Sequence, residues 1–241
     1  MPDAAKWGGL ETHQRNWLER TQAGLVAELR KRFGGWSLGQ RLMGLHVLST
    51  AGFLDDTWFN RTFWTYSRFW PGYYIANLAP KTGQLLVVGP KKTYAVQSYP
   101  TRNLQSPQFY PGTKGYLLLA DSNDNEPVLD PQTRMTTKGW GYRRKAPPAW
   151  FHWLPVRIRA MALAGERLFA AGPPDVVPPD DPMASFEGRA GAELRVFAAS
   201  DGQELFKAKL PSPPVFDGLV AAGGQLFMTT MDGHVVCLAG R

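Results

Sequence analysis

The fold is decided by LRVFAASDGQELF, residues 194–206, which contains two apolar runs separated by an Asp-Gly turn. It lies between two copies of one short phrase, AGERLF at residues 164–169 and AGGQLF at residues 222–227. Each phrase places a Gly-containing turn directly before a run that is typical of a β-strand. A strand–turn–strand unit that recurs along a chain indicates a repeat architecture. This pattern predicts much about the fold and little about chemistry.

Two further hairpins extend the pattern outward from this stretch. Residues 84–97 contain an apolar strand, a Pro-Lys-Lys turn and a return strand, and residues 225–238 repeat this outline around a Met-Asp-Gly turn. The spacing is uneven because residues 100–155 and 173–190 interrupt the repeats as insertions. The second insertion is rich in proline, which lacks an N–H for strand pairing, so we expect it to project from the sheet.

The N-terminal part has a different periodicity. Apolar residues between positions 10 and 34 recur at helical spacing, and two glycines at 34–35 end the run. The sequence therefore predicts one N-terminal α-helix within an extension over residues 1–41, followed by a strand within residues 42–50. The basic last turn of this helix suits a membrane surface, whereas the mixed charges of its polar face favour packing on its own domain.

The composition is that of a globular and basic chain. It has 241 residues, of which 44% are hydrophobic, and a net charge of +7 that permits attraction to nucleic acid. There is no uninterrupted apolar run of about 18 residues, so we expect no membrane span. The N-terminus lacks the apolar core of a secretory signal. The single cysteine, Cys237, excludes an intrachain disulfide and a thiolate zinc cluster.

Residues 194–210 and 232–238 are similar to the repeat of the PQQ-like (quinoprotein alcohol dehydrogenase-like) β-propeller proteins. Residues 52–66, 159–161 and 169–175 resemble a subgroup of these proteins that is frequent in planctomycete-like bacteria. The resemblance implies an all-β fold, namely a partial or small β-propeller of about three to four blades, each a four-stranded antiparallel sheet. Exported relatives are usual in the family, so the resemblance also implies a periplasmic or extracytoplasmic location.

The resemblance covers residues 42–240, and the copies depart from the family repeat at two positions. Ala198 stands where the family has Asp, and Phe206 stands where the family has a Trp that docks one blade on the next. The last blade ends after its third strand, at Leu238. We therefore expect the chain to be the C-terminal portion of a longer protein or a shortened relative. The edge after Leu238 is expected to be open, or covered by the strand within residues 42–50.

A polar and aromatic cluster at residues 55–61 is the first candidate ligand-binding site. Asp56 and Arg61 could hold a ligand on which Trp58 stacks, and Asp55 lies beside them. Arg159, from a segment that carries the resemblance, is the fifth candidate. The alternative is a structural turn in which Asp55 caps backbone N–H groups and Arg61 pairs with a carboxylate. Adjacent carboxylates on a strand point to opposite faces, which argues against paired-carboxylate hydrolysis.

Residues 121–126, Asp-Ser-Asn-Asp-Asn-Glu, are similar to the opening of a calcium loop because oxygen ligands alternate at the first, third and fifth positions. Glu126 replaces the glycine that such a loop needs, and Gln132 replaces the glutamate at its twelfth position. The four histidines show no ligand spacing. The sequence therefore predicts no metal site.

Residues 140–153 interleave Trp140, Tyr142, Trp150 and Trp153 with basic side chains and His152. This composition is found in single-strand nucleic-acid grooves. It is also that of a loop anchored by its tryptophans, which we favour because no nucleic-acid-binding motif accompanies it.

The sequence contains no phosphate-binding glycine loop, nucleophile elbow or haem-attachment motif. It therefore favours a non-catalytic PQQ-like β-propeller segment that serves as a binding or assembly scaffold. Its partner would be another protein or the remaining propeller blades, and a small ligand is compatible with this role. One alternative is a fragment of a PQQ-dependent oxidoreductase, in which PQQ is implied by the resemblance alone and its pocket lies in other blades. A second alternative is a basic nucleic-acid-binding protein.

Overall fold

The computed structural model describes residues 45–49, 64–68, 79–97, 101–102, 109–110, 115–135 and 139–239. The chain divides into two compact units, Met1–Leu45 and His46–Arg241, and the second unit contains every strand given below. Its sheets are antiparallel, and the described part has one short helix, α4 (Ala184–Glu187). The all-β class is therefore confirmed, whereas the predicted N-terminal helix lies outside the described residues. In the described part, no helix is long and apolar enough to cross a membrane.

The first four-stranded sheet contains the predicted hairpin of residues 84–97. Its strands are β4 (Leu85–Val88), β5 (Lys92–Gln97), β8 (Tyr116–Ser122) and β11 (Trp150–Leu154), in the order β11-β8-β5-β4. Its last two strands come from the segment that the sequence presents as an insertion, residues 100–155. The other strands of that segment form separate pairs, β6 (Thr101–Arg102) with β7 (Phe109–Tyr110) and β9 (Pro127–Met135) with β10 (Gly139–Arg144).

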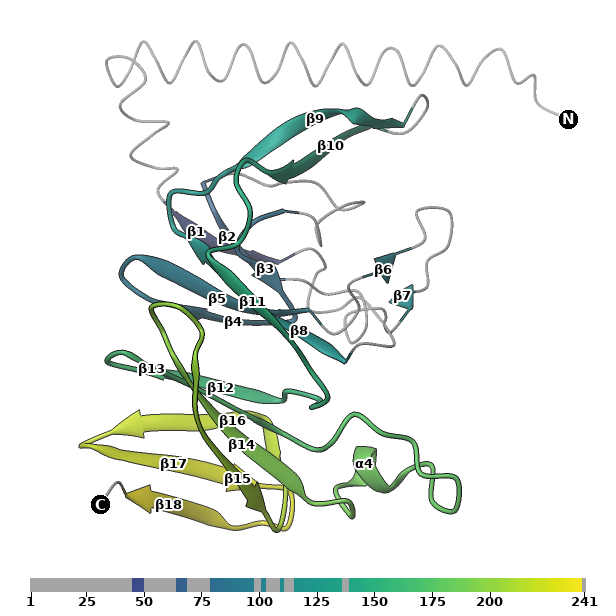
Figure 1. Cartoon of the computed structure of the whole chain (residues 1–241), viewed down its shortest axis with the longest axis vertical. Helices are drawn as coiled ribbons and strands as arrows, with labels where there is room; N and C mark the ends of the chain where they lie inside the picture. The colour runs from purple at the N-terminus through teal and green to yellow at the C-terminus, as the bar shows by residue number, and fades with distance from the viewer. Residues whose placement is uncertain are drawn as a thin grey trace, which may run out of the picture. The chain divides into compact units, whose positions relative to one another are not determined.

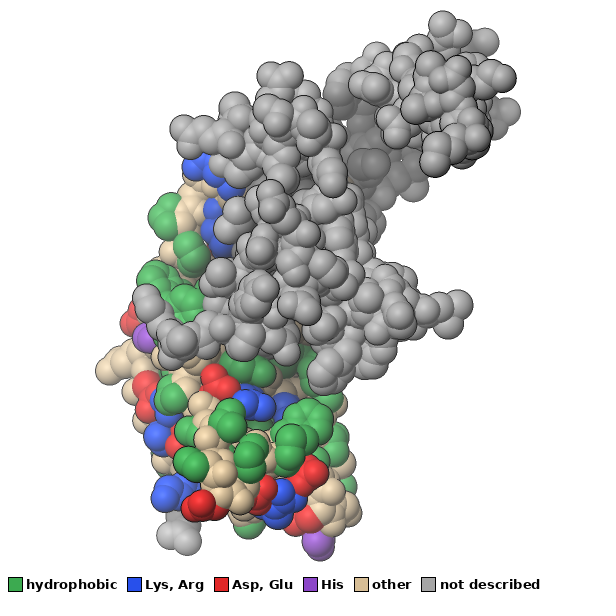
Figure 2. Space-filling view, turned by 90° about the vertical axis from the view of Figure 1, so that its right-hand side faces the viewer, with side chains coloured by type: hydrophobic (Ala, Val, Ile, Leu, Met, Phe, Trp, Pro, Cys, Tyr) green, Lys and Arg blue, Asp and Glu red, His purple; other side chains and the backbone are tan. Residues whose placement is uncertain are grey.

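The second four-stranded sheet contains residues 194–206. Its strands follow chain order, β12 (Ala160–Ala164), β13 (Arg167–Gly172), β14 (Ala192–Ala198) and β15 (Glu204–Leu210). The first copy of the repeated phrase forms the β12–β13 turn, and the Asp-Gly turn joins β14 to β15. The proline-rich segment with α4 lies between β13 and β14. Four apolar side chains in and around α4 are exposed: Val176, Val177, Met183 and Phe186. Figure 2 shows hydrophobic side chains among charged ones on one face of the molecule.

The last sheet has three strands, β16 (Pro214–Ala222), β17 (Gln225–Thr230) and β18 (Val235–Ala239). A further three-stranded sheet is formed by β1 (His46–Ser49), β2 (Trp64–Ser67) and β3 (Thr82–Gly83). The expectation that a strand within residues 42–50 covers the edge of β18 is wrong. That strand is β1, and it pairs with β2 from His46 opposite Ser67 to Ser49 opposite Trp64.

Two apolar cores join these sheets face to face. One lies between the two four-stranded sheets and contains Tyr94, Trp150, Leu168 and Phe197, among others. The other lies between the second sheet and the last one, with the small side chains of β12 against Leu219, Leu226 and Met228. The first strands of successive sheets adjoin one another, β4 against β12 and β12 against β16. Figure 1 shows this succession of sheets along the chain.

Candidate functional site

Four of the five predicted ligand-binding residues, Asp55, Asp56, Trp58 and Arg61, lie outside the described residues. The fifth, Arg159, lies directly before β12. Its Nη2 donates a hydrogen bond of 2.6 Å to the carbonyl oxygen of Phe186, and its guanidinium lies 5.8 Å from the centroid of the Phe186 ring. Its Nη1 contacts the sulfur of Met231. Arg159 therefore ties the α4 segment to the β17–β18 turn.

The backbone of Arg159 also joins two sheets. Its N–H donates to the carbonyl oxygen of Ala171 at 2.9 Å, and its own carbonyl accepts the N–H of Asp217 at 2.8 Å. Partial burial lowers the pKa of the Arg159 guanidinium, since desolvation disfavours the charged form. These contacts suit a structural role, and binding of a ligand by Arg159 stays a prediction.

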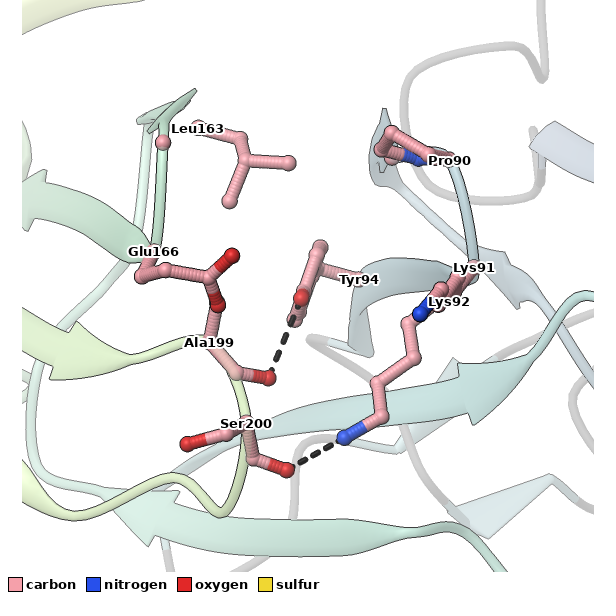
Figure 3. A pocket seen from close by; sticks show the side chains of 10 residues that line it. Pro90, Lys91, Lys92, Tyr94, Leu163, Glu166, Ala199 and Ser200 are labelled. Atoms are coloured by element: carbon pink, nitrogen blue, oxygen red, sulfur yellow. Dashed lines mark hydrogen bonds between the residues drawn. The ribbon is translucent and has the colours of Figure 1, made fainter.

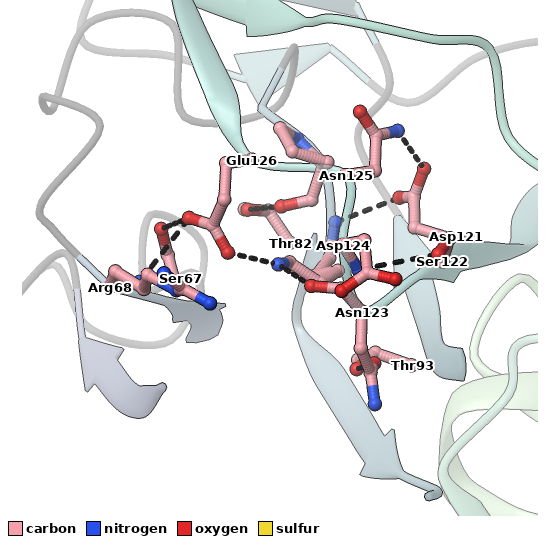
Figure 4. A network of polar contacts seen from close by, with 12 residues as sticks. Ser67, Arg68, Thr82, Thr93, Asp121, Ser122, Asn123, Asp124, Asn125 and Glu126 are labelled. Atoms are coloured by element: carbon pink, nitrogen blue, oxygen red, sulfur yellow. Dashed lines mark hydrogen bonds and ion pairs between the residues drawn. The ribbon is translucent and has the colours of Figure 1, made fainter. Parts of the chain in front are cut away.

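Lys81 occupies the loop in which the sequence suggests calcium ligands. The side chain is 0% exposed, which is rare for lysine. Its Nζ donates to the carbonyl oxygen of Asn123 at 2.8 Å and to Oε1 of Glu126 at 2.6 Å. Its backbone N–H donates to Oδ2 of Asp121 at 2.7 Å. Figure 4 shows the side chains of residues 121–126, with Ser67 beside Glu126.

Asp121 and Glu126 of this loop each have a further protein partner. Asp121 accepts a hydrogen bond from Nε of Arg144 at 3.2 Å. Oε2 of Glu126 accepts the hydroxyl of Ser67 at 2.8 Å. Because Ser67 belongs to β2 and Asp121 to β8, the network joins the β1–β3 sheet to the first four-stranded sheet. Its role in the described part is to connect two sheets through buried charge.

The carboxylates of the calcium-like loop are therefore already paired with positively charged side chains. Lys81 and Arg144 lie where a metal ion would otherwise balance the carboxylates. Among the described residues, no group of three or more His, Cys, Asp or Glu side chains could hold a metal ion. Sequence reasoning missed Lys81, because its side-chain partners lie 42 and 45 positions further along the chain.

The aromatic and basic segment of residues 140–153 contributes to the core and to this network. Trp150 is buried, and its indole N–H donates to the carbonyl oxygen of Ala199 at 3.3 Å. The His152 ring stacks on Phe197 with centroids 5.6 Å apart, and its Nε2 lies 2.8 Å from the carbonyl oxygen of Gly202. These side chains anchor the second four-stranded sheet on the first. The interpretation of an anchored loop is correct in that Trp150 is buried, but most of the segment belongs to β10 and β11 and not to a loop.

A cavity of about 330 Å³ lies where three turns meet. Figure 3 shows Lys91 and Lys92 on one side and Glu166 on the other, with Tyr94 between them. The Tyr94 hydroxyl donates to the carbonyl oxygen of Ala199 at 3.1 Å, and Nζ of Lys92 donates to that of Ser200. Burial, and secondarily the charge of Glu166, raises the pKa of Tyr94.

The lining of this cavity combines cationic and anionic side chains without a histidine or a cysteine. It could hold a small polar ligand, but it offers neither a thiol nucleophile nor an imidazole base. Two of its polar side chains already bond to backbone carbonyls of the β14–β15 turn. The cavity therefore lies at a junction between the two four-stranded sheets.

The outer side of the last sheet carries apolar side chains that the described residues leave exposed. Val220, Phe227 and Cys237 lie opposite one another in a row across the three strands, and Val235 lies beside them on the same side. Val220 is 59% exposed and Val235 is 70% exposed. We call these four residues the terminal face. The corresponding side of the second sheet is covered by the last sheet itself.

No protein-family model matches the chain, and no curated protein matches it.

Proposed function

We propose that this chain is a segment of a PQQ-like β-propeller that serves as a non-catalytic binding or assembly scaffold. The observation that carries the proposal is the terminal face, an exposed apolar surface at the end of a series of sheets that otherwise cover one another. Exposed apolar patches of this kind mark protein interaction sites. The partner is a further blade or another protein that packs on this face.

The arrangement of the sheets supports the propeller interpretation. Two consecutive sheets have four antiparallel strands in chain order, and neighbouring sheets adjoin through their first strands. Blades of a propeller cover one another in this manner around an axis. The last sheet, with three strands and a free face, is where such a series would continue. In the resembling family such proteins are exported, and we propose a periplasmic or extracytoplasmic location for this chain as well.

A comparative co-purification experiment tests the scaffold proposal. The wild-type chain, the double variant Val220→Lys/Val235→Lys and the control Val177→Lys are each used to capture proteins from extracts of the source cells. Val177 is also exposed but lies in the α4 segment. We expect specific partners with the wild type and the control, and their loss with the double variant. Equal capture by all three proteins would contradict the assignment to the terminal face.

A second experiment separates the scaffold from an oxidoreductase. The purified protein is incubated with PQQ and calcium, passed over a desalting column and assayed for bound quinone and for dye reduction with an alcohol. We expect no quinone to remain and no dye to be reduced. Retained quinone with alcohol-dependent dye reduction would overturn the non-catalytic proposal.

A further inference from the structure

The second sheet has one strand more than the last sheet that packs on it. Since β12 adjoins β16 and both sheets follow chain order outward, β13 corresponds to β17 and β14 to β18. No strand of the last sheet corresponds to β15. The fourth strand of the second sheet therefore overhangs the edge of β18.

The overhanging side of β15 is apolar. Phe206 pairs with Val196 in the ladder, Val196 pairs with Phe169, and Phe169 pairs with Ala162, which packs against the last sheet. Residues opposite one another share a side of a sheet, so Phe206 points toward the last sheet. It is nevertheless 54% exposed, and none of the described strands lies beneath it. Ala208, two residues further, lies on the same side.

The edge of β18 offers unpaired backbone groups in a definite order. At the base of the hairpin, the N–H of Thr230 donates to the carbonyl oxygen of His234 at 2.9 Å. Hydrogen-bonded pairs alternate along an antiparallel ladder, so Val236 and Leu238 bond to β17. The N–H and C=O groups of Val235, Cys237 and Ala239 point away from β17, toward the free edge. All three residues are exposed.

Among the described residues, β15 and β18 each lie at the outer edge of their sheet, and these two edges differ in charge. β15 carries Glu204, Lys207 and Lys209, and charged side chains are a common protection of an edge against further pairing. β18 has the sequence Val-Val-Cys-Leu-Ala and no charge. Its edge lacks that protection although its backbone groups are available.

From these observations we propose that the edge of β18 and the overhanging Phe206 and Ala208 form a slot for one β-strand, supplied as an extended segment of a partner protein. The proposal rests on the scaffold function and names the way in which a partner binds. The segment pairs antiparallel with β18. Its side chains opposite Val236 and Leu238 face the overhang, so apolar residues are required at two positions of alternating spacing.

The overhang decides between a single strand and a second copy of the chain. If a second copy of the chain paired with this edge through its own β18, its own second sheet, including β15, would also lie over the pair of β18 strands. Two overhanging strands would then compete for space that holds one strand. The slot therefore fits an isolated extended segment, which adds main-chain hydrogen bonds and buries Phe206.

A synthetic peptide with the sequence of residues 203–211 is the probe. In its own place this sequence forms β15 and carries Phe206, Ala208 and Leu210 at alternate positions. Binding of the fluorescein-labelled peptide to the full chain is measured by fluorescence anisotropy. A control peptide carries Phe206→Lys and Leu210→Lys. We expect saturable binding of the first peptide and at least tenfold weaker binding of the control.

Variants of the protein locate the binding. Cys237→Pro removes an N–H that points to the free edge, where proline is tolerated in a strand, and Cys237→Val is its control. Phe206→Lys places a charge in the slot, and Val177→Lys is its control. We expect at least tenfold weaker binding for each slot variant and unchanged binding for each control. Hydrogen exchange of the backbone amides of Val235, Cys237 and Ala239 should slow when the peptide binds.

Several results would overturn the slot. These are binding that the slot variants leave unchanged, absence of saturable binding, or amides at these three positions that already exchange slowly in the free protein because the chain fills its own slot. A dimer in sedimentation analysis that Cys237→Pro dissociates would assign the edge to a second copy instead. If co-purified partners are lost with the Val220→Lys/Val235→Lys variant but kept with Phe206→Lys and Cys237→Pro, the scaffold function stands and the slot fails.

Discussion

The second four-stranded sheet and the last sheet contain the same repeated phrase but have different surroundings. The β12–β15 sheet is covered on both sides, by the first sheet through Phe197 and Leu168 and by the last sheet through Leu194 and Ala171. The β16–β18 sheet is covered on one side, and the terminal face is exposed on the other. Similar strands therefore contribute different amounts to the stability of the folded chain, because the number of covered sides determines how much apolar surface is removed from water.

The largest expected difference concerns core truncation. Phe197 is buried between two sheets and stacks on the rings of Trp150 and His152. We expect Phe197→Ala to lower the free energy of unfolding by about 3–5 kcal/mol, because it removes a large side chain and leaves a cavity. Val220→Ala, on the terminal face, should change it by less than about 0.5 kcal/mol. Urea denaturation of both variants measures the difference, and similar losses would show that the terminal face is covered in the isolated protein.

Alanine substitutions at the glycines of the two Asp-Gly turns should also destabilise the two sheets unequally. We expect this difference in the free energy of unfolding to be smaller than that for core truncation. Gly202 has φ 81°, and a Cβ placed there would lie 2.6 Å from Cδ2 of Trp150. Gly233 has φ 85° and meets nothing within 4 Å. We expect Gly233→Ala to cost about 1–2 kcal/mol from its backbone conformation alone. Gly202→Ala should cost about 1–3 kcal/mol more, because it overpacks the sheet junction.

Thermal or urea unfolding of the two glycine variants, compared with the wild type, measures this contrast. The control is Gly223→Ala, since Gly223 also has a positive φ of 58° and open space around it. Equal destabilisation at Gly202 and Gly233 would contradict the packing of the β14–β15 turn against the first sheet.

Local sequence patterns predict most of this fold. Alternating apolar runs and Asp-Gly turns place β12 to β18 because strand pairing within a meander joins neighbours in sequence. The sequence does not reveal that β8 and β11 complete the first sheet. They are separated by the β9–β10 hairpin, so no local periodicity connects them. Partner choice is likewise invisible for β1, whose apolar pattern specifies a strand but not the neighbour with which it pairs.

The candidate sites were less accessible to sequence reasoning than the strands. The loop of residues 121–126 has the oxygen ligands of a calcium site, yet its charge is balanced by Lys81 from a distant turn. A long-range ion pair leaves no pattern in one sequence. The edge of β18 is different, because the repeat pattern predicts three strands up to Leu238, and the last sheet has three strands in the described part. The overhang of Phe206 has no signal in the sequence, because it depends on how the second sheet packs on the last one.

A buried polar contact at the covered sheet gives a smaller effect that depends on pH. Tyr94 donates to the carbonyl oxygen of Ala199 across the junction of the first two sheets, and burial raises the pKa of its hydroxyl above the ordinary 10.0. We expect Tyr94→Phe to cost about 1 kcal/mol at pH 7, which is typical of one hydrogen bond. A raised pKa means that the stabilisation is present below pH 10.0 and is lost as the pH rises through the raised value. Urea midpoints between pH 7 and 11 should therefore fall more steeply for the wild type than for the variant.

The smallest expected effect belongs to the last sheet. Asp217 has φ 56° in an irregular part of β16, and partial desolvation raises the pKa of its carboxyl group although the residue as a whole is exposed. Its ionised form is therefore less favourable in the folded chain, and stability from this group is lost as the pH rises through the raised pKa. Asp217→Asn removes that penalty and keeps a residue that tolerates positive φ. We expect a gain of less than about 0.5 kcal/mol at pH 7, because solvent screens a side chain this exposed. Urea denaturation at pH 7 and pH 3 should show the gain only at the higher pH, and a gain that is equal at both values would assign the effect to the backbone instead.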